Sequence, residues 1–277
     1  MTKQLIIFLF CLSIFWGCEN TNLNLAAEAG IDVIKAAMLR DRDVKLLAAN
    51  ASKQSDSKNP IAETRSPYGM RLEKLVGDRY NSNGYVFDFK VYLSPEINAF
   101  AMADGTIRIY SGLMDMMNDE EVLFVVGHEM GHVVEKHIKK KIMLAYAASA
   151  VRKGIASQEN LAGGVARSFL GEFAQTLLNA QFSQAEEREA DDFGILFLEN
   201  HGFDINAAIS ALKKLDGLEK NHSFLSSHPD PAIRADRLQK QVDSPGKIAT
   251  PSFLSKLIAN LKNLFPFLEG LIIKIFS

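Results

Sequence analysis

The chain has 277 residues, of which 47% are hydrophobic and 23% are charged, and its net charge at pH 7 is −2. This composition is ordinary for a folded protein and excludes a largely disordered or low-complexity chain. The charge is close to zero and we find no basic stripe of useful size, which argues against a nucleic-acid partner. The two cysteines are Cys11 and Cys18, so the sequence beyond residue 18 holds neither a disulfide framework nor a cysteine-based metal site.

The first 18 residues resemble an export signal. A lysine precedes an apolar run over residues 5–16, which is shorter than the roughly 20 residues of a membrane-spanning helix. The run ends in Gly17-Cys18, a small residue before cysteine, as at a bacterial lipoprotein cleavage site. We expect residues 1–17 to be a signal peptide and Cys18 to carry a lipid, which would place the protein in the periplasm, anchored to the cell membrane or the outer membrane. Two bulky aromatic residues before Gly17 leave an uncleaved anchor or a conventional signal as alternatives.

The rest of the sequence predicts a mostly helical chain with a few strands. The expected elements are a helical region over 21–50, a polar loop over 51–67, a helix over 68–80, a strand over 86–92 and a hairpin over 98–110 with its turn at 103–105. No proline occurs between Pro95 and Pro229, so the main helices are expected there. A loop is expected over 154–165, and helices near 166–180, 184–200 and 205–220.

One helix can be delimited at its start. Asn118 and Glu121 have the spacing of a capping box, in which each side chain accepts a hydrogen bond from the other residue's backbone N–H. The acidic residues of the first turn suit the positive end of the helix dipole. An apolar run over 122–126 follows, so we expect a buried helix from residue 119 onward.

This helix carries the sequence GHEMGH at residues 127–132, which contains an H-E-x-x-H motif. His128 and His132 are four residues apart, so their imidazoles project from one face and can bind one cation, while Glu129 can take a proton from a metal-bound water. Two surface histidines on an amphipathic helix are the alternative. The preceding apolar run, the capping box and two glycines, each of which costs about 1 kcal/mol relative to alanine in a helix, argue against that alternative.

Two histidines leave a catalytic zinc one protein ligand short of the usual three. His137 is one residue out of register for the third histidine of a metzincin, so we interpret it as a structural or surface residue. Glu187 and Asp191 are four residues apart on one helix face, which suits Glu187 as a ligand and Asp191 as the partner of a ligand histidine. Glu189 is about 200° around that helix from Glu187 and should face away. The same acidic segment could equally be a solvated helix face.

At this point the sequence resembles a known family. The HEMGH helix followed by an S-x-x-x-E-x-E-A-D helix is similar to the CAAX prenyl protease/HtpX-type zinc metallopeptidases, and residues 98–132 are similar to their soluble bacterial branch of periplasmic lipoproteins. The resemblance covers about residues 65–240 and extends weakly over 20–64. Gln184 stands where the family usually has arginine, which puts a local salt bridge in doubt.

The resemblance implies a zincin-like metallopeptidase of the gluzincin type. Its fold would be α+β and mostly helical, with a small β-sheet beside the H-E-x-x-H helix. One zinc ion per chain would bind to His128, His132 and Glu187, with Glu129 as the catalytic base and Asp191 as the aspartate behind the ligands.

The segment from Ser227 to Arg234 resembles the family's downstream His-Pro…Arg motif. A turn followed by a helix explains the same residues without any catalytic role. We expect His228 to act at the active site, either as a donor to the oxyanion or as a cap on the metal that holds the enzyme idle. Arg234 is a further candidate site residue.

These features predict a zinc metalloendopeptidase that hydrolyses peptide bonds in misfolded or unassembled cell-envelope proteins. Pairing of an extended substrate with an exposed strand would read mainly its backbone, and the candidate strand consists of Asn98, Ala99, Phe100 and Ala101. An envelope chaperone or assembly scaffold with a latent peptidase site is the alternative. A metal-binding lipoprotein without catalysis does not account for Glu129.

The expected organisation has four parts: the signal peptide at 1–17, a lipidated helical extension at 18–64, a catalytic domain at 65–245 and a hydrophobic tail at 246–277. The tail has helical periodicity with a proline at 266, which should kink it. It could pack on its own catalytic domain, lie in the membrane interface beside the lipid, or dock on another subunit.

Overall fold

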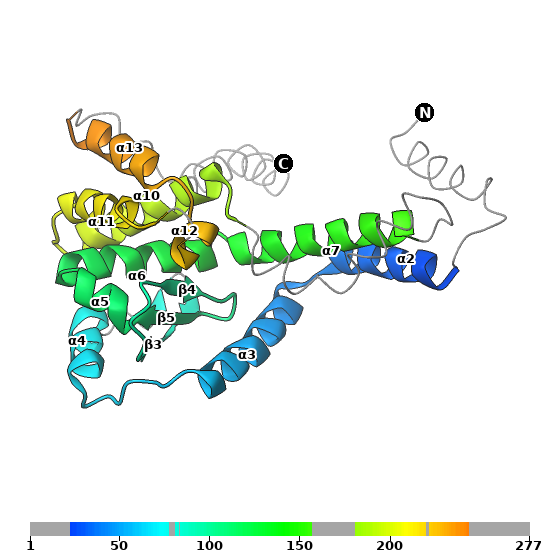
Figure 1. The fold of residues 1–277 in the computed structure, drawn as a ribbon, viewed down its shortest axis with the longest axis horizontal. Helices are drawn as coiled ribbons and strands as arrows, with labels where there is room; N and C mark the ends of the chain where they lie inside the picture. The colour runs from blue at the N-terminus through cyan, green and yellow to red at the C-terminus, as the bar shows by residue number, and fades with distance from the viewer. Residues whose placement is uncertain (1–22, 78–80, 83, 157–180, 220–221, 244–277) are drawn as a thin grey trace, which may run out of the picture. The chain divides into compact units, whose positions relative to one another are not determined.

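The structure is a computed structural model that describes residues 23–77, 81–82, 84–156, 181–219 and 222–243 (Figure 1). The predicted signal peptide with Cys18, the helix expected at 166–180 and the hydrophobic tail lie outside the described residues. The chain forms two compact units that alternate along the sequence. Among the described residues, the smaller unit contains 23–40 and 140–156, and the larger unit contains the others.

In the smaller unit, the described residues form α2 (Leu23–Met38) and most of α7 (His137–Ala156). Asp32 of α2 is buried, accepts a hydrogen bond from Ser149 Oγ at 2.8 Å and pairs with Lys153 Nζ at 2.9 Å, both on α7. These contacts tie the two helices together. Among the described residues, no helix has both the length and the apolar character needed to cross a membrane.

The larger unit contains a three-stranded sheet formed by β3 (Asp88–Tyr92), β4 (Ala99–Ala101) and β5 (Thr106–Tyr110), in the order β3-β5-β4. β3 runs parallel to β5, and β4 pairs antiparallel with β5 at the edge. The predicted hairpin is therefore confirmed. Gly105 in its turn has φ 100°, and a Cβ there would lie 2.4 Å from the Val86 carbonyl oxygen, so only glycine fits. A separate antiparallel ribbon consists of β1 (Asn81–Ser82) and β2 (Tyr85–Val86).

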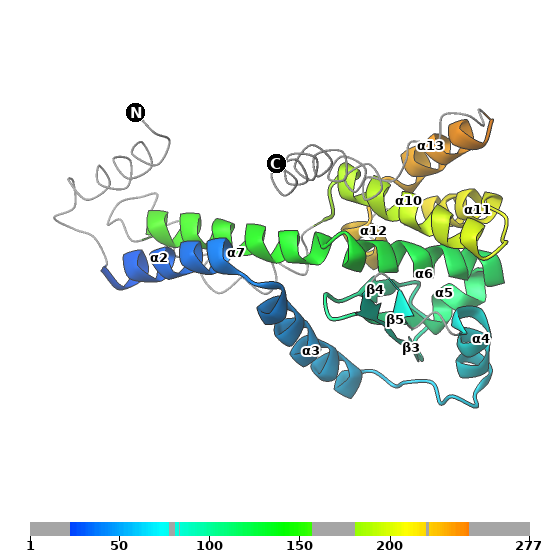
Figure 2. The ribbon, with the colours of Figure 1, turned by 180° about the vertical axis from the view of Figure 1, so that it is seen from behind.

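Helices cover the sheet in layers. α6 (Asp119–Val134) packs against β4 and β5, and α10 (Gln184–Asn200) and α11 (Asn206–Asp216) lie against α6 (Figures 1 and 2). The remaining described helices of this unit are α3 (Asp41–Lys58), α4 (Pro67–Val76), α5 (Ser111–Met116), α12 (Ser223–Ser227) and α13 (Pro231–Asp243). The expected α+β fold, mostly helical with a small sheet beside the H-E-x-x-H helix, is confirmed.

The polar loop expected from residue 51 begins later, because α3 continues to Lys58. Asp56, near the end of this helix, accepts from Arg108 Nε at 2.8 Å, from Tyr92 Oη at 2.8 Å and from Lys90 Nζ at 2.9 Å. The Arg108 side chain is 1% exposed and also binds the Asp88 carboxylate. These contacts with the sheet outweigh the weak helix propensity of the polar residues, which is a tertiary effect that local pattern does not reveal.

Two glycines explain how closely α10 approaches α6. A Cβ at Gly131 would lie 2.9 Å from Phe193 Cβ and 3.0 Å from Ala190 Cα, and a Cβ at Gly127 would lie 3.0 Å from Gly194 Cα. Real side chains do not fit at these distances. The glycines that weaken α6 as an isolated helix are therefore what allows α10 to bring its acidic residues beside the H-E-x-x-H motif.

Candidate metal centre

The first turns of α6 and α10 are fixed by capping boxes. Asn118 Oδ1 accepts from the Glu121 N–H at 2.9 Å, and Glu121 Oε2 accepts from the Asn118 N–H at 2.8 Å. The predicted capping box is therefore present. Ser183 and Glu186 form the same arrangement at the start of α10. Capping fixes where each helix begins and hence which face carries His128 and which carries Glu187.

Four buried side chains converge between α6, α10 and the turn before α13. His128 Nε2 lies 3.1 Å from His132 Nε2, and the two oxygens of Glu187 lie 3.4 Å from His132 Nε2 and 3.6 Å from His128 Nε2. His228 Nδ1 lies 3.3 Å from His128 Nε2 and 3.1 Å from Glu187 Oε1. All four donor atoms lie within 4.8 Å of one another.

This spacing fits a divalent cation. Tetrahedral zinc with bonds of about 2.0–2.2 Å separates its nitrogen and oxygen ligand atoms by roughly 3.3–3.6 Å, and the observed separations cluster around that range. Burial holds the pKa of His132 well below its usual value, so its imidazole is neutral, which is the form that binds metals. The sequence-predicted ligands His128, His132 and Glu187 are thus brought together, and His228 joins them as a fourth donor.

Arg234 compensates the buried carboxylates behind this cluster. Its Nη2 lies 2.6 Å from Asp191 Oδ1, and its Nη1 lies 2.5 Å from Glu187 Oε2. Burial by itself raises the pKa of both carboxyl groups. The Arg234 guanidinium, acting together with His128 on Asp191 and with His228 and His132 on Glu187, outweighs burial and holds both pKa values below their usual range. Asp191 Oδ1 also lies 3.0 Å from His128 Nδ1, so this carboxylate can accept the proton of the outer ring nitrogen.

Glu129 lies beside the cluster with one oxygen available. Its side chain is buried, and Oε1 has no hydrogen-bond partner among the described residues. His228 Nε2 lies 3.5 Å from this oxygen. A buried carboxylate oxygen without a donor is unfavourable unless something else occupies that place, and a water molecule between Glu129 and the four donors would provide the missing partner.

His228 is held in place by an unusual turn. Asp230, two residues later, has φ 56°, a left-handed conformation that aspartate tolerates better than most residues. Gln184 Nε2 donates to Asp230 Oδ2 at 3.3 Å, so the residue that departs from the family pattern still binds this turn. The Phe224 ring stacks on His228 with centroids 4.7 Å apart.

The structure corrects the expectation for Glu189. We expected this side chain to face away from the site, but its Oε2 lies 3.0 Å from His137 Nε2, and His137 Nδ1 lies 3.0 Å from His132 Nδ1. His137 itself is fully buried. His137 contacts His132 but does not belong to the cluster of four donors, which agrees with its interpretation as a structural residue and not with a surface position.

The predicted substrate strand is an edge of the sheet. β4 comprises Ala99, Phe100 and Ala101, and Asn98 precedes it, with its backbone oxygen accepting from the Tyr110 N–H at 3.0 Å. Within the described residues, β4 pairs with β5 and with no other strand. It also packs against α6, the helix that carries His128 and His132.

Comparison with known proteins gives a consistent result. The chain matches the family described as Peptidase family M48 over residues 70–242. Metalloprotease LoiP of Escherichia coli (strain K12) is 38% identical over 247 residues, which cover 88% of this chain and 98% of that protein. Metalloprotease YcaL of the same organism is 36% identical over 249 residues, with coverages of 88% and 98%. The beta-barrel assembly-enhancing protease of Yersinia pestis is 27% identical over 66% of this chain and 40% of that protein.

Proposed function

Since the chain belongs to peptidase family M48 and is therefore a metalloendopeptidase, we propose that it works with one zinc ion bound by His128, His132 and Glu187. The observation that carries this proposal is the convergence of two imidazoles and one carboxylate at the spacing of a tetrahedral site. Nitrogen and carboxylate ligands of this kind are typical of catalytic zinc.

Bound zinc would polarise the scissile carbonyl and lower the pKa of its water to about 7. Glu129 is the general base, because its buried Oε1 is free of other donors in the described residues and can accept the water proton. The same carboxyl group then delivers that proton to the leaving amine. Asp191 keeps His128 oriented through Nδ1, and Arg234 keeps Asp191 and Glu187 ionised.

The substrate is an extended polypeptide that adds to the outer edge of β4. Backbone hydrogen bonds to such an edge tolerate many side chains, and Phe100 and Ala101 of β4 are only partly buried. We further propose that the substrates are misfolded or unassembled cell-envelope proteins. The export signal and the likeness to a protease named for enhancing β-barrel assembly support this step.

The described conformation is a resting form in which His228 caps the site. His228 Nδ1 contacts both His128 Nε2 and Glu187 Oε1 and so takes the fourth donor position, which catalytic zinc sites keep open for water or substrate. Activity then requires His228 to move away. This contact favours an inhibitory role of His228 over a role as oxyanion donor. The alternative function, a scaffold or chaperone with a latent peptidase, would then belong to the capped state.

We also propose that Cys18 carries a lipid that anchors the protein in the periplasm, on the basis of the Gly17-Cys18 sequence after the apolar run. Metabolic labelling with a radioactive fatty acid tests this step. The full-length protein should incorporate the label and Cys18→Ala should not, whereas equal labelling of both would contradict it.

The test of the catalytic proposal is digestion of unfolded β-casein by the full-length protein purified in detergent. Cleavage should require zinc, stop with a chelator and return when zinc is restored. Glu129→Gln should lower the rate by roughly 10²–10⁴-fold while metal analysis still finds about one zinc per chain. Loss of zinc in this variant would show that Glu129 is a ligand and not the base.

His228→Ala tests the cap in the same assay. Because this variant opens the fourth position and keeps the three proposed ligands, cleavage should rise several-fold with zinc retained. A fall of roughly 10²-fold would instead identify His228 as an oxyanion donor.

A further inference from the structure

We propose that His137 and Glu189 form a relay that holds His132 in the tautomer and orientation needed to bind the metal, and that both are positioning residues. This inference rests on the proposed zinc site and extends it by two residues. His132 Nδ1 lies 3.0 Å from His137 Nδ1, and His137 Nε2 lies 3.0 Å from Glu189 Oε2. The three side chains therefore form a continuous line that starts at a ligand and ends at a carboxylate.

The protons of this line can be assigned in one consistent way. His132 must present Nε2 without a proton to the metal, so its neutral ring carries the proton on Nδ1. That N–H can donate to His137 Nδ1 only if the proton of His137 is on Nε2. The Nε2–H of His137 then donates to Glu189, which as a carboxylate has only acceptors. The tautomer of each histidine is thus fixed by the next residue outward. The line ends in the negatively charged carboxylate of Glu189, which can accept the last proton donor.

Burial keeps water from replacing the hydrogen bonds of this relay. The His132 and His137 side chains are both 0% exposed, whereas Glu189 is 22% exposed. The Phe182 ring stacks on His132 with centroids 3.8 Å apart, which excludes water from that face. A buried imidazole N–H without an acceptor is costly, so His137 supplies a partner that solvent does not provide.

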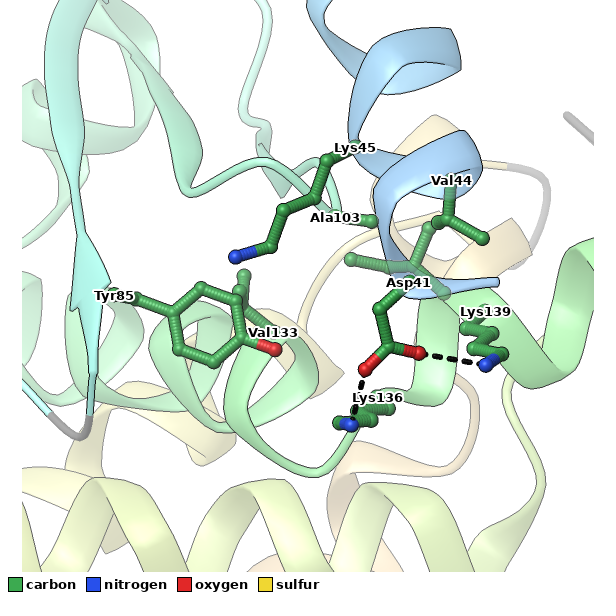
Figure 3. Close-up of a pocket in the computed structure, with 9 residues that line it drawn as sticks. Asp41, Val44, Lys45, Tyr85, Ala103, Val133, Lys136 and Lys139 are labelled. Atoms are coloured by element: carbon green, nitrogen blue, oxygen red, sulfur yellow. Dashed lines mark hydrogen bonds and ion pairs between the residues drawn. The ribbon is translucent and has the colours of Figure 1, made fainter. Parts of the chain in front are cut away.

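His137 reaches this place because the chain breaks its helix just before it. Lys136 has φ 59°, and α7 starts at the next residue. Figure 3 shows Asp41 of α3 between Lys136 and Lys139, with Nζ to carboxylate distances of 2.5 and 2.6 Å. The two lysines lie on either side of His137 in the sequence. Asp41 therefore bridges them and stabilises the turn that positions His137.

The test measures zinc affinity and the cobalt(II) spectrum of the full-length protein in detergent, with no reference to cleavage. His137→Ala should weaken zinc binding by roughly ten- to hundredfold and change the visible absorption of the cobalt-substituted site. His137→Asn should restore part of the affinity, since its amide oxygen can accept from His132 Nδ1. Glu189→Ala should weaken binding less, and the double variant should be no weaker than His137→Ala, because both changes break one line.

Glu199→Ala is the matched control, since it removes an exposed glutamate from the same helix, and it should leave affinity and spectrum unchanged. His137→Ala could lose zinc affinity simply because it folds poorly, which a strongly lowered unfolding temperature of the metal-free variant would reveal. In that case Glu189→Ala and Glu189→Gln are measured instead, because Glu189 is partly exposed and its replacement disturbs the fold less. Unchanged affinity and an unchanged cobalt spectrum in the His137 and Glu189 variants would overturn the relay. Failure of the unmodified protein to bind zinc would instead overturn the proposed function.

Discussion

The two histidines of the H-E-x-x-H motif are supported in different ways. His128 contacts a carboxylate directly, since Asp191 Oδ1 lies 3.0 Å from its Nδ1 and the Asp191 side chain is 0% exposed. His132 reaches a carboxylate through a second imidazole, and that carboxylate is 22% exposed. A fully buried acid needs a compensating charge, and Arg234 is present on the His128 side. On the His132 side, solvent reaches the Glu189 carboxylate, so its charge needs less compensation from the protein.

The difference follows from helix packing. Along α10, Asp191 comes directly after Ala190, one of the residues at which α10 contacts Gly131 of α6, so a short side chain reaches His128. Beyond Val134, α6 has ended, and the space beside His132 is filled from the start of α7 by His137. One helix, α10, nevertheless supplies both terminal carboxylates and the proposed ligand Glu187. The comparison teaches that a single helix can orient both histidines if one of them is reached through a relay.

The largest expected effect separates the two sides. Asp191→Ala removes a buried partner of Arg234 and should lower the free energy of unfolding by roughly 3–5 kcal/mol, whereas Glu189→Ala should lower it by about 1 kcal/mol or less. Thermal and urea unfolding of the metal-free proteins measure both. Equal losses of unfolding free energy in the two variants would contradict this comparison. They would show that the buried Asp191 and the partly exposed Glu189 contribute equally to stability.

A second change should affect both sides together. Gly131→Val places a branched side chain where even a Cβ would lie 2.9 Å from Phe193 Cβ, so α10 must move and carry Glu187 away from the histidines. We expect a loss of about 1–3 kcal/mol in unfolding free energy and much weaker zinc binding. Gly30→Val in α2 is the matched control, because no atom lies within 4 Å of its Cβ position. Unchanged zinc binding in Gly131→Val would refute the role of close helix packing.

Local patterns predicted the parts of the site that local rules control. The capping box at Asn118, the hairpin turn at Gly105 and the shared face of His128 and His132 depend on spacing within a few residues. Glu187 by itself fits an acidic helix face, and its spacing with Asp191 together with the upstream H-E-x-x-H motif favours it as a ligand. These predictions did not need knowledge of distant contacts.

The relay could not be predicted in the same way. Its position depends on the turn at Lys136, a left-handed residue without the glycine that usually signals such a turn. Counting along one unbroken helix therefore could not show that His137 contacts His132. The length of α3 was underestimated for a related reason, because the contact between Asp56 and Arg108 joins residues 52 positions apart.

The smallest effect concerns the turn that carries His137. Lys136 and Lys139 together lower the pKa of Asp41 to about 2, and the Asp41 side chain is 47% exposed. Exposed pairs of this kind contribute about 1 kcal/mol or less. Asp41→Asn should therefore cause only a small loss of stability at pH 7 and less than about a threefold loss of zinc affinity.

Its pH dependence provides the sharper test. Because the pKa of Asp41 is lower in the folded protein than its ordinary value of 3.8, its contribution is fully present well above pH 4 and is lost as the pH falls toward 2. The stabilities of the unmodified protein and of Asp41→Asn should therefore converge in acid. High salt should narrow the gap at pH 7 as well. A difference in stability between the two proteins that persists at low pH would show that Asp41 supports the turn by packing and not by charge. The His132 side would then depend on packing as the His128 side does.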